Sequence, residues 1–537
     1  MLLPVARVSS ALCGAPTRGC RSARSATSAR GAFPSEAGER AAVSRRKVWR
    51  FLLEWNVIFL LFANSAVAAP ADFFGIHVTD EVTGRGVPLV QLRTVNDITL
   101  WTDSAGWVAF QEPGLMDREV FFAIESPGYE KEKDGFGNRG VRLTTTTGAS
   151  AEVKIKRTIV AERLYRLTGQ GIYRDSVLLG KAVPIKEPNL NAGVLGQDSV
   201  QAVPYRGRLF WLWGDTNLPH YPLGNFHTTC ATSSLDAKPD AGIDFQYFTE
   251  PEHPDRVRGM VREKESGPVW IFGLLTVPDD AGKETLFGHF TRHRSLSEIV
   301  EQGLVRFDDA TGLFEKIVKL DLGEKWRFPQ GNAVRVREGD GDYWYFAAPL
   351  CHTRVKATLQ AVRDPANYEA FAWDGERYAW TRDHAPTTQH AEDELIRAGK
   401  LSAEAARYRV VDAVTGEAVS IHGGSIEWNE FRKKWVLIAS QAGGKSAPSY
   451  LGEVWYAEAD SVTGPWRKAV KIASHPHYTF YNPRHHTFLD EDGGRRIYFE
   501  GTYTQTFSGN PVATPRYEYN QIMYRLDLAD SRLDVAR

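Results

Sequence analysis

The chain has 537 residues, of which 42% are hydrophobic, 12% aromatic and 24% charged, and its formal net charge is −1. This composition is typical of a globular protein with roughly two to four domains, and it excludes a disordered, collagen-like or coiled-coil chain. The first 69 residues carry ten Lys or Arg and three Glu, which leaves 55 basic and 63 acidic residues, a charge of −8, in the rest. Because that remainder lacks a basic footprint, we predict no nucleic-acid partner.

The N-terminal residues 1–69 have the pattern of a secretory signal peptide. Basic residues at 45–47 precede an apolar run at 57–62 and an Ala66-Val67-Ala68 cleavage site. The apolar run is too short to span a bilayer comfortably, so we expect no stable membrane insertion after cleavage; a membrane anchor is the alternative. The Arg-, Ser- and Ala-rich stretch before Val43 is unusual for a signal, and we predict that translation starts near Val43. The expected location is therefore periplasmic or secreted.

Two cysteines remain after the leader, Cys230 and Cys351. They allow one disulfide, but two cysteines in a chain of this length do not make a disulfide-dependent scaffold.

A separate β-sandwich is predicted over residues 73–157. Short alternating strands recur there at about ten-residue spacing, at 74–78, 89–92, 106–110 and 120–124. The segment Val78–Gly128, with its Thr83-Gly84 and Thr102-Asp103-Ser104-Ala105-Gly106 turns, resembles carboxypeptidase-regulatory-like sandwich domains. Such modules are usually accessory, and we expect no chemistry in this one.

From about residue 190 onward, one pattern returns five times: a polar cluster, a strand, a tight turn and an aromatic strand. The copies cover residues 197–213, 269–290, 330–346, 422–438 and 484–499. Outer segments repeat as well, since Thr311–Lys316 echoes Thr463–Lys468. Recurrence of four-strand units predicts an all-β fold with a five-bladed β-propeller over residues 165–530, in which Leu164–Val183 closes the ring. A two-sheet sandwich is the alternative.

Two insertions into this pattern have helical signals. Ser295-Leu296-Ser297-Glu298 matches a capping box and predicts a short helix. Ala391–Tyr408 is rich in Glu, Leu, Ala and Arg without the period of a strand, and it predicts a second helical segment.

The first inner hairpin carries a pair of acidic residues. Its turn is Arg206-Gly207-Arg208, with Asp198 nine residues before Gly207 and Asp215 eight residues after it. Because the two strands are antiparallel, both side chains return to the same end of the blade, where the innermost strands surround a central funnel. The alternative is a structural role, in which Asp215 only caps a turn in Gly214-Asp215-Thr216-Asn217.

The last hairpin repeats this arrangement, with His485 and Glu500 seven residues on either side of the turn at Asp492-Gly493. The aromatic rings of Trp213, Tyr221 and Tyr481 are expected to stack on sugars, and Arg484 to bind an anionic group. For His485-His486, packing and metal binding are the alternatives to ligand contact. Together the strand ends predict one ring of polar side chains: Asp198, Asp215, Asn332, His422, Arg484, His485, His486 and Glu500.

Paired carboxyl groups in a propeller funnel suit glycoside hydrolysis, which needs one acid to protonate the leaving oxygen and a second to activate water or attack the sugar. Repulsion and burial raise one pKa and keep that group protonated near neutrality. We expect no cofactor and find no closed set of metal ligands at recognised spacing, although a structural cation in the channel is allowed. The predicted catalytic residues are Asp198, Asp215 and Glu500, and the predicted substrate-binding residues are Trp213, Asn332, His422, Tyr481, Arg484, His485 and His486.

The first blade also carries a family resemblance. Gly196-Gln197-Asp198-Ser199, the turn, and Trp211-Leu212-Trp213-Gly214-Asp215-Thr216-Asn217 resemble the opening of a five-bladed propeller family formerly of unknown function, some of whose members cleave D-arabinan. More broadly, the chain is similar to arabinanase/levansucrase-like propellers. The resemblance implies that Asp198 and Asp215 are the catalytic pair. The later blades depart from the arabinanase pattern, since no middle blade has a clear third carboxylate.

The sequence thus predicts an exported glycan-active enzyme, a glycoside hydrolase acting on a polysaccharide or oligosaccharide. A polysaccharide lyase is the first alternative, in which Tyr481 or His485 removes a proton beside a uronate carboxylate that Arg484 neutralises. A non-catalytic carbohydrate-binding propeller is the second.

Overall fold

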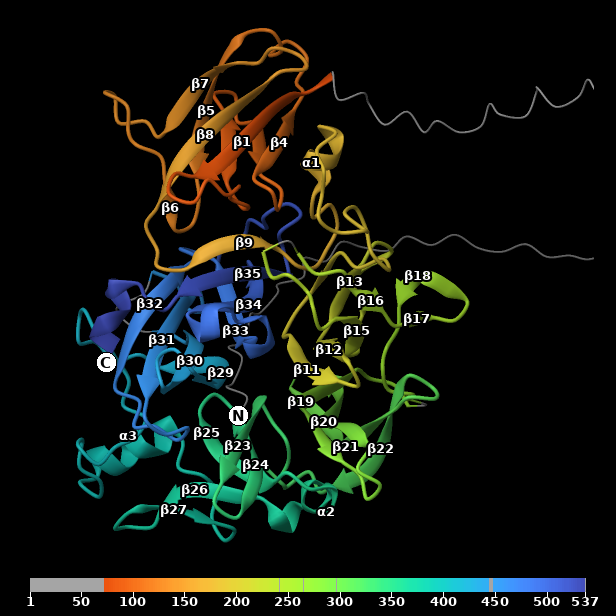
Figure 1. Cartoon of the computed structure of the whole chain (residues 1–537), viewed down its shortest axis with the longest axis vertical. Coiled ribbons are helices and arrows are strands. Elements are labelled where there is room, and N and C mark those ends of the chain that lie inside the picture. Colours follow the sequence, from red (N-terminus) through yellow and green to blue (C-terminus); the bar gives the residue numbers. More distant parts are fainter. Residues whose placement is uncertain (1–71, 241, 264, 296, 444–447, 537) are drawn as a thin grey trace, which may run out of the picture. The chain divides into compact units, whose positions relative to one another are not determined.

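The computed structural model of the protein describes residues 72–240, 242–263, 265–295, 297–443 and 448–536. The predicted signal peptide, residues 1–69, lies outside these residues. The described part of the chain is dominated by strands and confirms the all-β fold (Figure 1). Its α-helices are short, and none of them is long and apolar enough to cross a membrane. They are α1 (Arg174–Leu178), α2 (Leu359–Arg363) and α3 (Gln389–Arg397).

The first strands build two four-stranded sheets around a common apolar core that includes Ile76, Val108 and Phe122. Alternate side chains of each strand point into this core, as in β5, whose burial alternates along Glu119–Glu125. The four strands predicted between residues 74 and 124 are all present. One sheet contains β4 (Trp107–Phe110), β1 (Phe74–Asp80), β8 (Ser150–Arg157) and β6 (Tyr129–Glu130), and the other β3 (Thr99–Trp101), β2 (Gln91–Thr94), β5 and β7 (Gly140–Thr144).

Five further sheets form the blades of a propeller (Figure 1). From the inside outward, blade I contains β11 (Gln201–Tyr205), β12 (Arg208–Trp213), β15 (Thr229–Ser234) and β16 (Gln246–Tyr247), and blade II β19 (Val269–Pro278), β20 (Glu284–Ser295), β21 (Glu298–Asp308) and β22 (Leu313–Leu320). Blade III contains β23 (Asn332–Glu338), β24 (Gly341–Ala347), β25 (Cys351–Lys356), β26 (Glu369–Trp373) and β27 (Tyr378–Thr381).

Blade IV contains β29 (Ile421–Asn429), β30 (Lys434–Gln441), β31 (Glu453–Ala459), β32 (Lys468–Ser474) and β28 (Val411–Asp412), and blade V β33 (Thr479–His485), β34 (Arg496–Thr504), β35 (Asn520–Asp527) and β9 (Glu162–Arg166). Two small sheets extend blade I: β10 (Gly196–Gln197) with β13 (Thr216–Leu218) and β14 (Tyr221–Asn225), and β17 (Thr249–Glu250) with β18 (His253–Val257).

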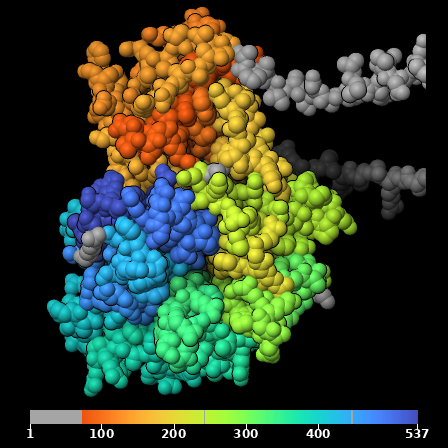
Figure 2. Space-filling view, in the orientation of Figure 1, coloured from red at the N-terminus to blue at the C-terminus, as the bar shows by residue number. Residues whose placement is uncertain are grey.

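The innermost strands contact one another in chain order, from β11 through β19, β23 and β29 to β33. The ring closes in two ways. Strand β9, from the N-terminal side of the propeller, becomes the outer strand of blade V beside β35, so the prediction that Leu164–Val183 closes the ring is confirmed for the first residues of that segment. Side chains of blade V also bond to the start of blade I, and Figure 2 shows the blue C-terminal strands directly beside the yellow-green first blade.

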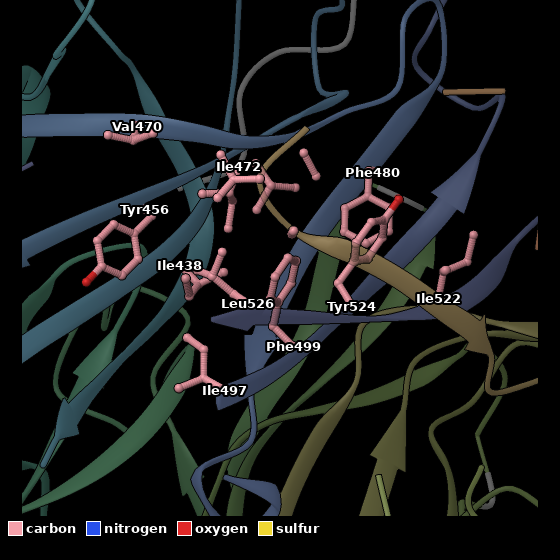
Figure 3. Close-up of a cluster of buried hydrophobic side chains, with 14 of the residues drawn as sticks. Ile438, Tyr456, Val470, Ile472, Phe480, Ile497, Phe499, Ile522, Tyr524 and Leu526 are labelled. Carbon is pink, nitrogen blue, oxygen red and sulfur yellow. The ribbon is translucent and has the colours of Figure 1, made fainter. Parts of the chain in front are cut away.

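Neighbouring blades bury both faces of the central strands, such as β12 and β31. In β12 the residues alternate: Trp211 and Trp213 pack toward blade V with Tyr498, whereas Phe210 packs toward blade II with Ile271. The same packing joins blades IV and V, where aliphatic and aromatic side chains of both interdigitate (Figure 3). Strands buried on both faces read as continuous apolar runs, which is why the aromatic strands are conspicuous in the sequence.

Of the two predicted helical insertions, one is wrong and one is confirmed in part. Ser295 ends β20 and Glu298 begins β21, so this segment is a β-hairpin, not a helix opened by a capping box. The insertion at 391–408 does contain a helix, α3, which ends at Arg397.

The last inner strand begins earlier than the repeat pattern indicated. Strand β33 starts at Thr479, and Arg484 and His485 lie at its other end, about 15–20 Å along the strand. The two remaining cysteines do not pair: Cys230 and Cys351 are buried free thiols.

Candidate functional site

The two acids of the first hairpin meet, as the hairpin geometry predicts. Strands β11 and β12 pair from Tyr205↔Arg208 at the turn to Gln201↔Leu212, which leaves Asp198 and Asp215 just beyond the open end. There the Gly214 N–H donates to the Asp198 carbonyl at 2.8 Å, and the Asp215 N–H bonds to the Asp198 carboxylate. A Cβ at Gly214 would lie 2.2 Å from Asp198 Oδ1, so only glycine allows this approach.

Asp198 lies among hydroxyl groups from blade V and keeps part of its surface exposed. Tyr481 Oη donates to Asp198 Oδ2 at 2.7 Å, and the hydroxyls of Tyr519 and Ser199 bond to the same carboxylate. Burial raises the pKa of Asp198, and these donors together with the Asp215 N–H oppose that rise because they stabilise the ionised form. The surroundings therefore provide a prepared site for a carboxylate.

Asp215 has a different environment. It is buried and has one side-chain donor, Trp270, whose Nε1–H donates to Asp215 Oδ1 at 2.7 Å. The pKa of Asp215 is raised to about 7, mainly by burial and also by the charge of Asp198, while the Trp270 bond acts in the opposite direction. Because Asp198 has several donors and Asp215 only one, the proton of the pair belongs on Asp215.

The backbone around Asp198 is strained. Ser199, Asn482 and Tyr519 all have left-handed φ angles, of 56°, 48° and 60°. Such a conformation costs a non-glycine residue roughly 1–2 kcal/mol. Three such residues around one carboxylate are the kind of concentration that occurs at functional sites.

A buried hydrogen-bond network holds this strained segment to blade V. Asn482 Nδ2 donates to Ser199 Oγ at 2.9 Å, and the Ser199 N–H donates to Thr502 Oγ1 at 3.0 Å. Gln521 Nε2 bonds to both Thr502 Oγ1, at 2.8 Å, and the Gln197 carbonyl, at 3.1 Å. The position of Asp198 is therefore set across the junction between the first and last blades.

Two predicted binding residues begin inner strands on the same side of the ring as the acids. Asn332 opens β23 and is half-buried, with Nδ2 donating to the Gly424 carbonyl at 2.8 Å. His422 is the second residue of β29 and is exposed, although surrounding protein atoms lower its pKa through desolvation. His422 is thus exposed to solvent and has protein atoms around it, as expected for a residue that lines a funnel.

The aromatic residues predicted to stack on sugars differ in exposure. Trp213 has no exposed surface because it packs in the apolar cluster between blades I and V, and its ring lies 5.1 Å from that of Phe245, which precedes β16 of its own blade; the expectation that it contacts a sugar is therefore wrong. Tyr221 is 61% exposed on β14, in the hairpin that begins directly after Asp215. Tyr481 is nearly buried and contacts Asp198 through its hydroxyl.

The charged residues of the last inner strand do not join the acid pair. Arg484 Nη1 lies 3.0 Å from Glu427 Oε1, and His485 Nε2 lies 2.9 Å from Asp490 Oδ1; all four partners are largely or fully buried. They lie near the far end of β33 because that strand begins at Thr479. The prediction that Arg484 and His485 sit in the ring of strand ends around Asp198 is therefore corrected.

His486 and Glu500 form a separate buried pair. His486 Nε2 is 2.7 Å from Glu500 Oε1, and their side chains are 0% and 1% exposed. Burial raises the pKa of Glu500 to about 8 and lowers that of His486 well below its ordinary value, so both are neutral at pH 7. With Trp211 packed against His486 at 5.1 Å, a substrate has no surface of either residue to touch, which corrects the catalytic prediction for Glu500 and the binding prediction for His486.

Two residues at this site escaped the sequence reasoning, Trp270 and Tyr519. Trp270 opens the aromatic run of the second blade, and recognising it as the start of an inner strand would have placed it beside Asp215. Tyr519 directly precedes β35, and no local signal connects it with Asp198, 321 positions earlier. Among the described residues, no group of three His, Cys, Asp or Glu side chains could hold a metal ion.

Comparison with known proteins found no matching family model and no matching curated sequence. Solved structures with a similar course of the chain include an exo-1,5-α-L-arabinanase from a bovine ruminal metagenomic library (10% identity, 63% of this chain and 94% of that one, TM-score 0.34). A second is the α-L-arabinofuranosidase of Fusarium graminearum (12% identity, 69% of this chain and 99% of that one, TM-score 0.35). A third is the α-L-arabinanase of Penicillium chrysogenum (14% identity, 68% of this chain and 99% of that one, TM-score 0.34).

Proposed function

We propose that this protein is an exported glycoside hydrolase in which Asp215 is the general acid and Asp198 is the ionised partner. The observation that carries the proposal is the meeting of two carboxyl groups at the open end of the first inner hairpin, in environments that differ. Asp198 is surrounded by donors that favour a carboxylate, and Asp215 holds a proton near neutrality. Two neighbouring acids in opposite protonation states are what glycoside hydrolysis uses.

In the proposed reaction, Asp215 gives its proton to the glycosidic oxygen as the bond to the sugar breaks. Asp198 either removes a proton from the attacking water or attacks the sugar carbon itself. Tyr481 and Tyr519 hold the carboxylate of Asp198 in place, and Trp270 orients Asp215. Asn332 and His422 are proposed to line the funnel beside the substrate.

A lyase is less well supported by the same geometry. Burial and the charge of Asp198 hold the pKa of Tyr481 well above its usual range, which makes it a poor base. The guanidinium of Arg484 lies beside the Glu427 carboxylate in the interior, so it offers no free charge to a uronate.

The test is a panel of soluble polysaccharides, including arabinan, galactan, xylan and pectin, scored for new reducing ends and for the ultraviolet absorbance of unsaturated products. The wild type is expected to release reducing ends only, and Asp198→Asn and Asp215→Asn are each expected to reduce the rate by about 10²–10⁴-fold. Asp236→Asn, an exposed acid of the same blade, is the matched control and should keep full activity.

Three outcomes would contradict the proposal. New ultraviolet absorbance would indicate a lyase. Binding without cleavage by the wild type would indicate a carbohydrate-binding propeller. Full activity in either Asp variant would remove the acid pair from the chemistry.

A further inference from the structure

An exposed aromatic side chain lies beside the acid pair without a role in the fold. Phe507 is 64% exposed, on the segment between β34 and β35, in the part of the chain that contributes Tyr519 to the site. Its ring meets that of Tyr481 edge-on, with centroids 6.2 Å apart and planes at 79°, and Tyr481 in turn bonds to Asp198. The ring thus extends the site outward from Asp198 on the blade V side.

Stability does not account for this arrangement. Phe507 has a left-handed φ of 66°, which is costly for a bulky residue, and its exposed ring recovers little of that cost by burial. An exposed apolar ring held in an unfavourable backbone conformation beside a reactive site suggests that the ring contacts a ligand.

The segment that carries Phe507 is well anchored. Thr479 Oγ1 donates to the Thr506 carbonyl at 2.6 Å, and the Ser508 N–H donates to the Gln505 carbonyl at 3.0 Å. The Gln505 N–H donates to Glu518 Oε2 at 2.9 Å, close to Tyr519. These bonds fix both flanks of Phe507, so the ring is presented in a defined place relative to Asp198.

A second exposed aromatic residue lies in the hairpin that follows Asp215, but farther from the acids. Tyr221 belongs to the hairpin that starts at Thr216, directly after Asp215. Tyr221 pairs with Leu218 near the tip of that hairpin, whereas Asn225 pairs with Thr216, the residue after Asp215, so it is Phe507 and not Tyr221 that contacts the site. A flat ring without a polar group suits the C–H face of a sugar, and because Tyr481 lies between Phe507 and Asp198, a sugar on Phe507 would be a different unit from the one at the cleaved bond.

We propose that Phe507 forms a sugar-binding subsite on the Asp198 side of the cleaved bond, and that the substrate is a glycan chain of several units lying across the acid pair. This inference rests on the proposed function, because the chain is placed by the two acids. The ring is proposed to bind substrate, not to take part in the chemistry.

The test uses Asp215→Asn as a non-cleaving background and measures retardation in gels containing the polysaccharide that the wild type cleaves fastest. Phe507→Ala in that background should weaken the apparent affinity by about three- to tenfold, the range of a lost aromatic stacking contact. Phe507→Tyr should restore it. The control is Phe136→Ala, since Phe136 is 91% exposed on the N-terminal sandwich. All variants should melt at the wild-type temperature.

With active enzyme, Phe507→Ala should raise KM on the polysaccharide more than KM on a short aryl glycoside. Equal retardation of the Phe507 and Phe136 variants on a polysaccharide that the wild type cleaves would overturn the subsite and leave the hydrolase intact. A wild type that cleaves none of the panel would instead overturn the proposed function, and the subsite with it.

Discussion

At the scale of single residues, the difference between Asp198 and Asp215 comes from the donors that each carboxyl group meets. Tyr481, Tyr519 and Ser199 all favour the charged form of Asp198, whereas Asp215 has only the indole N–H of Trp270. The protonation states are therefore set by burial of both acids, by the charge of Asp198 acting on Asp215, and by the unequal number of donors around the two groups.

The pH dependence of the proposed activity follows from the acid that must hold a proton. Because burial raises the pKa of Asp215 to about 7, the protonated form is present below that pH and is lost above it. The rate of polysaccharide cleavage should thus fall on the alkaline side with a midpoint near pH 7, approaching tenfold per pH unit. A rate that stays level up to pH 9 would show that Asp215 is not the acid.

Trp270 offers a direct way to move that midpoint. Trp270→Phe keeps the ring but removes the N–H that stabilises ionised Asp215, so the alkaline midpoint should rise by about one pH unit, the size expected for one lost hydrogen bond to a charged group. Trp428→Phe is the matched control, because Trp428 Nε1 donates to a surface carboxylate, Glu430, at 2.8 Å. A downward movement, or equal profiles for both variants, would contradict the assigned role.

At the scale of elements, the short strand β9 contributes to the closure of the ring. All five of its residues are buried, and it pairs with β35, which follows Tyr519 and thus helps to hold the site. Leu164 packs with Trp211, Tyr498 and Met523 where blade V meets blade I. The outer strand of the last blade is therefore part of the closure that positions Asp198.

Leu164→Ala tests this closure. The lost contacts and the cavity left behind should lower the free energy of unfolding by about 2–5 kcal/mol, measured by denaturant unfolding. Val414→Ala, at a side chain that is 80% exposed, should change it by less than about 0.5 kcal/mol. If both variants unfold alike, β9 does not seal the ring.

The same scale shows which element predictions succeed. Inner hairpins were recognisable because strand, tight turn and aromatic strand are local patterns, and Asn332 and His422 do begin β23 and β29. Blade V was misplaced by several residues because Arg484-His485-His486 looks like the polar start of a strand. In the structure Arg484 is buried beside Glu427, His485 beside Asp490 and His486 beside Glu500, an arrangement that only tertiary neighbours can create.

At the scale of the whole molecule, the propeller and the N-terminal sandwich share a buried polar junction. Arg163 of β9 is 1% exposed and donates to the Pro88 carbonyl at 3.0 Å, the Pro127 carbonyl at 2.7 Å and Ser126 Oγ at 2.6 Å. Tyr517 donates to the Thr102 carbonyl at 2.7 Å. The sandwich is thus bonded to the strand that closes the ring and to the segment before Tyr519.

We expect the two parts to unfold together because of this junction. In calorimetry the wild type should show one transition, and Arg163→Ala should lower its midpoint or split it in two, because the carbonyls of Pro88 and Pro127 lose a buried charged donor. Arg294→Ala removes an exposed ion pair with Glu298 and should leave the trace unchanged. Two transitions in the wild type would show that the sandwich is an independent appendage.

The sequence by itself determined the all-β class, the five repeats and the meeting of Asp198 with Asp215, since hairpin geometry depends on the strand period and the turn. Only the tertiary structure decided which other side chains join them. Trp213 turns away because its face of β12 meets blade V, and Tyr519 arrives because β35 lies beside the closing strand. Contacts between the first and last blades depend on how the ring closes, and no local pattern along the chain records that.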